Sequence, residues 1–253
     1  MTSEAGTDAN APTAGDADPV ALSARYVRAT KTADGDVAAI RQALATLDSR
    51  TLADALDDDR SRLAFWLNVY NASAQDHLSR DASLFDERGF PPTRPIFRRD
   101  LVTVAGEAMS LDDVEHGILR RSRSGIGLGY VPRFRRSAFE RRHRVDAVDP
   151  RIHFALNCGA ASCPPVLAYS AADVDAELDA ATRSYLGSEV SYDPDADVAS
   201  VPKLFSWYRG DFGGKSGIRA FLREHEVVPA DAAPRLAWSE YDWSLKLGAF
   251  ADD

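Results

Sequence analysis

The sequence predicts a single α+β domain in which several helices pack on a small, mostly antiparallel sheet. Helical patterns dominate the first third of the chain, and short strand patterns lie between helices further on. The two kinds of element do not alternate regularly, as they would in a doubly wound parallel sheet. The length of 253 residues suits one large domain. No internal stretch has the composition of a linker long enough to divide residues 19–253.

The N-terminal elements follow from composition and from the spacing of apolar residues. Residues 1–18 predict a disordered acidic tail, because they hold too little apolar surface to offset the entropy of ordering. A helical pattern covers residues 19–47, with an interruption near Gly35. A second helix is expected over residues 52–78, where Trp66 belongs to an apolar stripe with spacings of three and four.

The later elements are shorter. Ser110 with Asp113 is typical of a helix start, and it follows a short hairpin around Gly106. Residues 152–156 are mostly apolar and predict a buried strand. The remaining expected elements are helices at 171–186 and 218–222, strands at 190–192, 198–201 and 237–247, and an aromatic helical turn at 204–208. The side chains expected to be largely buried are those of Trp66, Phe154, Leu156 and Trp207.

The charged residues are mostly aspartates and arginines, with few glutamates and lysines. Of the 39 acidic residues 29 are Asp, and of the 30 basic residues 26 are Arg. The net charge of -9 argues against a general binder of nucleic acid or anionic membrane. Short carboxylates in excess, with few lysines, suit a surface kept soluble by self-repulsion at high salt. We therefore predict a halophilic protein, with the codon bias of a GC-rich genome as the alternative explanation.

A halophilic protein should need molar KCl or NaCl to reach its full stability. We expect the melting temperature to rise between low and molar salt, because salt screens the repulsion among the excess carboxylates. Thermal melts across a salt series measure this effect. A midpoint that stays constant or falls with added salt would remove the halophile interpretation.

The sequence also predicts a reducing cytoplasmic environment. No stretch of 18 or more apolar residues is present, so no transmembrane helix is expected. The N-terminus lacks the basic and apolar regions of a secretory signal. The two cysteines, Cys158 and Cys163, do not make a disulfide framework.

Residues 151–165 hold the densest set of reactive groups. Cys158 follows an apolar run and enters a Gly-Ala-Ala turn, where backbone N–H groups would lower the pKa of a thiol. We expect Cys163 to stay an ordinary thiol, because two prolines follow it. His153 and Cys158 would point to opposite faces of a strand, which makes them poor direct partners. The alternative is that both cysteines are small buried apolar residues after a core strand.

Three further polar residues are candidates for a site. His116 could act as a general base, with a histidine at the rim of the core beside a salt-bridged Glu115 as the alternative. Asn71 lies on an otherwise apolar helix, where a buried amide needs partners. It could orient a histidine ring as the third member of a Cys–His–Asn set, or it could bond to a neighbouring backbone.

The arginine-rich stretch at residues 120–151 is the last candidate. Its ten arginines and the glycines of residues 125–129 could bind phosphate or RNA. The glycine pattern follows no strand and lacks the lysine of a phosphate-binding loop. The alternative is a flexible insertion that neutralises an acidic body. No metal site is expected, since Cys-x4-Cys with scattered histidines is not a standard zinc spacing.

Five blocks of the sequence resemble the successive blocks of the "domain of unknown function 547" family, over about residues 60–247. The resemblance implies that Asn71, Glu115, His116 and Cys158 belong to the family pattern. It implies no established activity, and no block covers the arginine-rich insertion at 121–148. The blocks are FWLNVYNA at 65–72, SLDDVEHGILR at 110–120, DPRIHFALNCGAASCP at 149–164, FSWYRGDF at 205–212 and YDWSL at 241–245.

A family pattern with these polar residues in separate blocks favours a thiol-dependent hydrolase or acyltransferase. Cys158 would be the nucleophile, His116 the general base, Asn71 the residue that orients its ring, and Glu115 a source of charge or substrate contact. The order of His before Cys would fit a papain-like fold in a permuted order. The expected substrate is a small molecule or a peptide, with no cofactor, metal, nucleic acid or membrane. The alternatives are a non-catalytic protein-interaction domain and an anion-binding module built on the arginine-rich segment.

Overall fold

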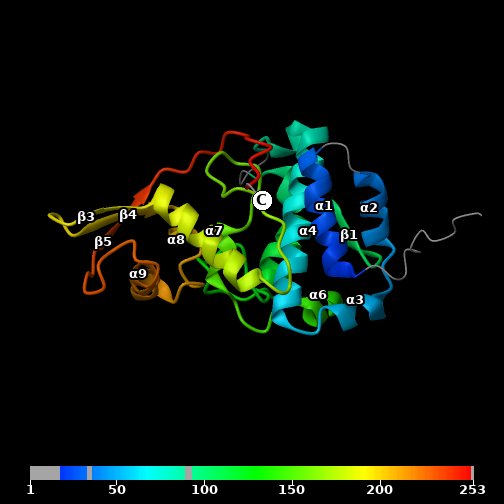
Figure 1. Ribbon diagram of the computed structural model, residues 1–253, viewed down its shortest axis with the longest axis horizontal. Helices are drawn as coiled ribbons and strands as arrows, with labels where there is room; N and C mark the ends of the chain where they lie inside the picture. The colour runs from blue at the N-terminus through cyan, green and yellow to red at the C-terminus, as the bar shows by residue number, and fades with distance from the viewer. Residues whose placement is uncertain (1–17, 33–35, 89–92, 252–253) are drawn as a thin grey trace, which may run out of the picture.

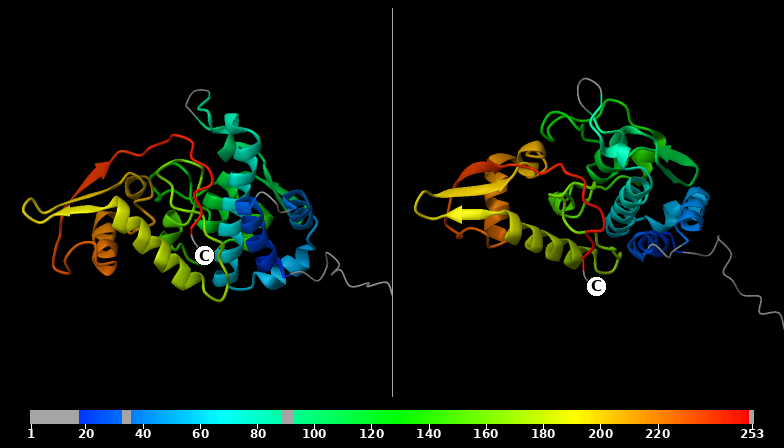
Figure 2. Two further views of the ribbon diagram at one scale, coloured as in Figure 1. Left: turned by 45° about the horizontal axis from the view of Figure 1, so that its top comes forward. Right: turned by 90° about the horizontal axis from the view of Figure 1, so that it is seen from above.

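The computed structural model describes residues 18–32, 36–88 and 93–251, and its elements gather into two lobes (Figures 1 and 2). The first lobe is built on α1 (Pro19–Thr32), α2 (Val37–Ala45), α3 (Ser49–Ala55) and α4 (Asp59–Arg80). The second lobe holds a small sheet with α7 (Val174–Glu189), α8 (Leu204–Trp207) and α9 (Gly214–Glu224). The predicted tail lies outside the described residues, apart from Asp18.

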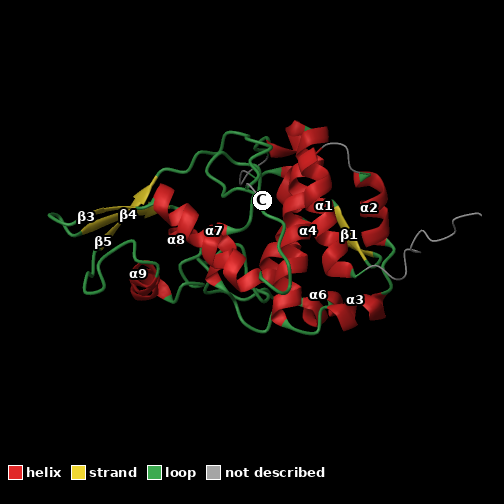
Figure 3. Ribbon diagram, in the orientation of Figure 1, coloured by secondary structure: helices red, strands yellow, loops and turns green. Residues whose placement is uncertain are grey.

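The α+β class is confirmed, but the strands form two small sheets instead of one (Figure 3). In the first lobe, β1 (Val102–Val104) and β2 (Glu107–Met109) make the predicted antiparallel hairpin. In the second, β4 (Val198–Pro202) pairs antiparallel with β3 (Ser191–Asp193) and parallel with β5 (Arg235–Ser239). The β4–β5 pair is parallel because the chain between these strands crosses over through α8 and α9.

The long helix predicted from residue 52 is in fact two helices. α3 ends at Ala55, and α4 begins only at Asp59. The side chain of Asp58 accepts a hydrogen bond from the backbone N–H of Ser61 at 2.8 Å, which caps the start of α4. α4 packs along α1, and its central residues are buried on nearly every side. The apolar spacing alone suggested one continuous helix, but the cap at Asp58 starts a new helix there.

The predicted helix start at Ser110 is confirmed as a reciprocal capping box. The N–H of Asp113 donates to Oγ of Ser110 at 3.1 Å, and the N–H of Ser110 donates back to Oδ2 of Asp113 at 3.1 Å. The helix that follows, η2 (Asp113–Leu119), is π-helical. Its wider turn is shown by the bond from the N–H of Arg120 to the carbonyl of Glu115 at 2.8 Å.

The strand predicted at residues 152–156 is wrong, because this segment is the 3-10 helix η3 (Pro150–Phe154). Asp149 caps it by accepting from the N–H of Arg151 at 2.9 Å, and Pro150 occupies its first turn. Residues 152–157 are all buried. A short helix buried on every side gives the same unbroken apolar run as a buried strand, so the pattern alone did not separate them.

The final strand also differs from its predicted span of 237–247. β5 ends at Ser239, and the chain then leaves the sheet and returns toward the first lobe (Figure 1). There it pairs with the loop that carries the cysteines: the N–H of Ala161 donates to the carbonyl of Ser244, and that of Lys246 to the carbonyl of Gly159, both at 2.8 Å. The other short helices are η1 (Ala82–Phe85), α5 (Pro95–Arg98) and α6 (Ala138–His143).

Each lobe has its own cluster of buried apolar side chains. Trp66 and Leu156 lie in the first cluster and Phe154 in the second, and all three are buried as predicted. Trp207 is only half-buried, contrary to the prediction, because it borders a cavity between the lobes. None of the helices within the described part of the chain is long and apolar enough to cross a membrane.

Candidate functional site

A small cavity of about 90 Å³ lies where the two lobes and the C-terminal segment meet. Aromatic side chains from all three parts form much of its wall, among them Tyr70, Tyr208 and Tyr241. Four residues with reactive side chains also line it, which are Glu115, His153, Cys158 and Cys163. The cavity therefore brings together side chains from all five sequence blocks, and the predicted base His116 is not among them.

Asn71 fixes the backbone that leads to the cysteines. Its side-chain amide donates to the carbonyl of Ala155 at 2.9 Å, and its side-chain oxygen accepts from the N–H of Asn157 at 2.8 Å. All three groups are buried, so these bonds satisfy backbone atoms that water does not reach. Within the described residues Asn71 bonds to no histidine. The structure thus gives it the backbone-bracing alternative instead of the predicted orienting role.

A tight turn after Cys158 brings the two thiols together. Gly159 has φ +94°, a backbone conformation that strains any residue with a Cβ atom, so glycine is favoured there. The turn places Sγ of Cys158 3.1 Å from Sγ of Cys163. Both thiols are free, with Cys158 buried and Cys163 half-buried.

The groups around Cys163 favour its ionised form, the thiolate. Its sulfur accepts from the backbone N–H of Cys158 at 3.3 Å and lies 3.3 Å from the hydroxyl of Tyr241. These donors and the Cys158 thiol lower the pKa of Cys163 to about 7, against the effect of burial. The pKa of Cys158 is raised, because its proton is held by Cys163 and because the thiol is buried. The expected order of acidity is therefore reversed, since the N–H of Cys158 points at the other sulfur.

Glu115 supplies a buried carboxylate to the cavity. Its Oε2 accepts from the hydroxyl of Tyr70 at 3.4 Å, and its buried Oε1 has no hydrogen-bond partner among the described residues. Burial would raise the pKa of Glu115, but the nearby His116, Arg120 and His153 outweigh burial and lower it. Glu115 is thus an ionised group whose Oε1 accepts no hydrogen bond and lies 3.4 Å from Nδ1 of His116.

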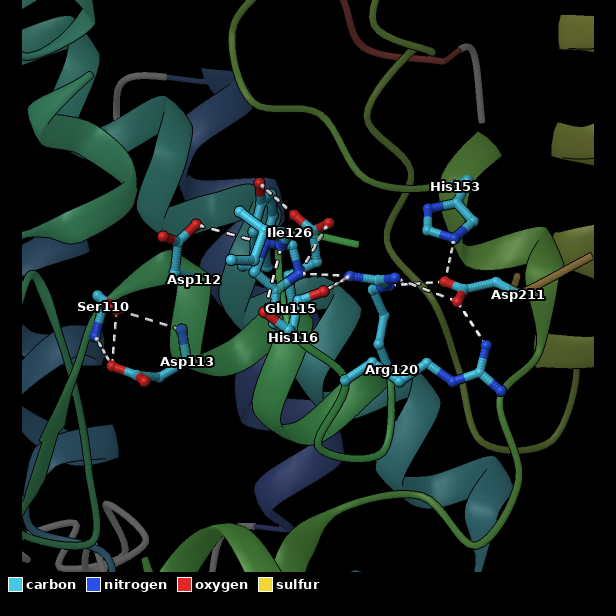
Figure 4. A network of polar contacts seen from close by, with 12 residues as sticks. Ser110, Asp112, Asp113, Glu115, His116, Arg120, Ile126, His153 and Asp211 are labelled. Atoms are coloured by element: carbon cyan, nitrogen blue, oxygen red, sulfur yellow. Dashed lines mark hydrogen bonds and ion pairs between the residues drawn. The ribbon is translucent and has the colours of Figure 1, made fainter. Parts of the chain in front are cut away.

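His116 faces a second, larger pocket of about 580 Å³. Its Nδ1 lies 2.9 Å from Nη1 of Arg120, which can only donate, so the ring proton sits on Nε2 (Figure 4). Nε2 lies 3.7 Å from a carboxylate oxygen of Asp112. Burial lowers the pKa of His116, against the effect of the nearby Glu115 carboxylate. Burial also raises the pKa of Asp112, to about 7, with a contribution from Glu115.

A buried ionic network around Asp211 joins the lobes, and sequence reasoning missed it. Asp211 Oδ2 lies 2.9 Å from Nε2 of His153 and 2.6 Å from Nε of Arg120 (Figure 4). Its Oδ1 accepts from Arg123 at 2.6 Å. The ring of His153 stacks on Tyr208 with centroids 3.9 Å apart, and burial lowers the pKa of His153. A neutral His153 that donates from Nε2 to Asp211 keeps the lone pair of Nδ1 available as an acceptor.

The arginine-rich segment is held in place by an ion pair to η2 and by a hydrogen bond within the segment. Arg133 bonds to Asp113 at 2.6 Å, and Arg144 donates to Oγ of Ser122 at 2.9 Å. Its Gly129 serves close packing, because a Cβ atom there would lie 2.6 Å from Oδ1 of Asp211. Within the described ranges no three His, Cys, Asp or Glu side chains are grouped so that they could hold a metal ion.

The fold and the cavity together define an α+β protein with a paired-thiol site between two lobes. The profile of the family described as "Protein of unknown function, DUF547" matches residues 54–186, and the chain belongs to this family. The match includes Asn71, Glu115, His116 and Cys158, and it ends before the resemblance at 205–212 and 241–245. Searches of the curated proteins and of the solved structures find no match.

Proposed function

We propose that the protein is a thiol-dependent hydrolase or acyltransferase whose nucleophile is the sulfur of Cys163. The observation that supports this is the set of donors around that sulfur, since a thiolate held by fixed donors is ready to attack a carbonyl carbon. The sequence pointed to Cys158 for this role. In the proposal Cys158 positions the thiolate instead, by directing its S–H and its N–H at the sulfur of Cys163.

The reaction has two steps. The Cys163 thiolate adds to the carbonyl carbon of an ester or amide, a C–S bond forms, and the leaving group departs with its bonding electrons and takes up a proton. Water or an amine then adds to the thioester, the C–S bond breaks, and the sulfur leaves again as a thiolate. Glu115 accepts the proton of the incoming nucleophile, which suits an ionised carboxylate in the same cavity whose Oε1 accepts no hydrogen bond.

His153 is a second acceptor in the cavity, held in a fixed tautomer by Asp211. The larger pocket beside the cavity offers room for the rest of a small-molecule or peptide substrate, because Phe97 and Trp243 form part of the wall of both. The chemistry needs both thiols reduced, which fits the reducing cytoplasm expected from the sequence.

Trapping the acyl group with p-nitrophenyl acetate tests the proposal. We expect a burst of p-nitrophenol and one acetyl group on the wild-type protein, located on Cys163 by fragmentation of the tryptic peptide 152–183. Cys163→Ser should lose both signals, whereas Cys158→Ser should keep the adduct on Cys163. Glu115→Gln should let the thioester accumulate, because proton transfer from water is slowed. If no cysteine is acetylated in the folded protein, the interaction-domain alternative is favoured instead.

A further inference from the structure

The sulfur of Cys158 contacts the proposed nucleophile, the sulfur of Cys163. The proposed acyl transfer forms no covalent bond to Cys158. The two Sγ atoms lie 3.1 Å apart, in the same cavity. We propose that Cys158 and Cys163 are a reversible dithiol–disulfide pair, in which a hydroperoxide oxidises Cys163 and Cys158 resolves the product. This inference goes beyond acyl transfer and holds whether or not the cavity is a hydrolase site.

The geometry makes closure of the disulfide a small movement. A disulfide bond is about 2.05 Å long, so the sulfurs need to approach by only about 1 Å. The loop that carries them is held from outside by the C-terminal segment. The N–H of Asp242 donates to Oγ of Ser162 at 2.8 Å, in addition to the bonds that reach Gly159 and Ala161. These bonds keep the sulfurs facing each other, so no rearrangement of the lobes is needed before they react.

The size of the loop indicates a disulfide that opens again. Only residues 159–162 lie between the two cysteines. A disulfide that encloses so few residues removes less entropy from the unfolded chain than one that closes a long loop, so it adds less to the stability of the fold. Low-molecular-weight thiols can therefore reduce it without opposing a large gain in folding free energy. This is the behaviour of a regulatory pair, in contrast to a structural crosslink.

The oxidation balances with a hydroperoxide, ROOH, as the oxidant. The Cys163 thiolate attacks the terminal oxygen, the O–O bond breaks, and the alkoxide leaves and takes up a proton as ROH. Cys163 is then a sulfenic acid. The sulfur of Cys158 attacks the sulfur of Cys163, the S–S bond forms, and the hydroxide that leaves combines with the proton of Cys158 as water. Two thiols and one hydroperoxide thus give one disulfide, one alcohol and one water.

The disulfide would remove the group that the proposed acyl transfer needs. Oxidation converts the Cys163 thiolate into a neutral sulfur, and the hydroxyl of Tyr241 loses a charged acceptor. Reduction by two equivalents of a thiol restores both groups. The pair would in this way switch the cavity off under oxidising conditions.

Mass spectrometry of the whole protein tests the inference without any acyl substrate. The native protein is treated with hydrogen peroxide near one equivalent at pH 7, unfolded in the presence of iodoacetamide, and weighed. We expect the loss of two hydrogens and no alkylation, with both cysteines alkylated again after dithiothreitol. Cys158→Ser should stop at a sulfenic acid on Cys163 that dimedone captures. Cys163→Ser should consume peroxide more than roughly tenfold more slowly, since the remaining thiol of Cys158 is buried.

Three results would overturn the inference: two alkylatable cysteines after peroxide, disulfides only between molecules, or equal peroxide consumption by the wild type and Cys163→Ser. Because the readout is mass, a protein that forms the disulfide but takes up no acetyl group would retain this inference and lose the acyl-transfer proposal. A protein that takes up the acetyl group but forms no disulfide would retain the acyl-transfer proposal and lose this inference.

Discussion

Replacing Asp211 by alanine should lower the free energy of unfolding by about 3–5 kcal/mol, as removal of one partner of a buried ion pair does. The side chain of Asp211 is fully buried, and that of Arg120 is 1% exposed. Without the carboxylate, the guanidinium of Arg120 stays buried with no opposite charge bonded to it, and Nε2 of His153 loses its acceptor. The loss also removes a link between the lobes, because Arg120 follows η2 in the first lobe and Asp211 follows α8 in the second.

Asp146→Ala is a matched control for this prediction. Asp146 pairs with Arg62 at 3.1 Å, but its side chain is 86% exposed, so its removal should cost less than about 1 kcal/mol. Urea denaturation of both variants gives the comparison. If Asp211→Ala fails to fold, Asp211→Asn keeps the volume and should show a smaller loss. A cost for Asp211→Ala no larger than that of the control would contradict the account of the network.

The same network contributes to the dependence of the folding stability on pH in the acid range. Burial alone would raise the pKa of Asp211, but its bonds to His153 and Arg120 outweigh burial and lower it. A carboxyl group with a lowered pKa contributes stability that is fully present above its unfolded value of about 3.9. This contribution is lost as the pH falls below that value toward the pKa of the folded state.

The helices of the first lobe could be predicted because their sequences carry local signals. The apolar stripe through Trp66 gave the position of α4, and Ser110 with Asp113 gave the start of η2. Both depend on neighbours within a few residues along the chain. The error at residues 52–58 has the same origin, because the cap at Asp58 is a local signal that the apolar pattern concealed.

The assignment of residues 152–156 to a strand had a consequence for the site. On a strand, His153 would point away from the face that carries Cys158, whereas on η3 it lines the same cavity. The combination of Asp149 and Pro150 is a helix-start signal that could have corrected the assignment. Asp211 stood in the quoted block FSWYRGDF, but nothing nearby in the sequence shows that it bonds to His153, 58 residues away.

The acidity of the two thiols depends on contacts that a sequence does not reveal. The glycine turn after Cys158 was recognised, but the direction of the N–H of Cys158 became visible only in the structure. The hydroxyl near Cys163 belongs to Tyr241, 78 residues further along the chain. Asn71 was correctly expected to bond to something specific, and its partners proved to be the backbone of Ala155 and Asn157.

Cys163 should react with iodoacetamide more than roughly tenfold faster than Cys158 at pH 7, since only thiolates are alkylated. In the proposed charge state the N–H of Cys158 and the hydroxyl of Tyr241 lie beside a Cys163 thiolate, and Cys158 keeps its proton. Tyr241→Phe removes one donor and should move the alkylation midpoint of Cys163 to higher pH. Tyr185→Phe is the matched control, because the hydroxyl of Tyr185 donates to the carbonyl of Ser162 and to neither sulfur.

The alkylation rate of each cysteine as a function of pH, followed by peptide mass spectrometry, is the most direct test of a thiolate at Cys163. We expect the rate at Cys163 to rise through a midpoint of about 7 and then to level off. At Cys158 the rate should stay low and continue to rise beyond pH 9. A midpoint for Cys163 at the ordinary thiol value of about 8.5, or faster alkylation of Cys158 at pH 7, would contradict it.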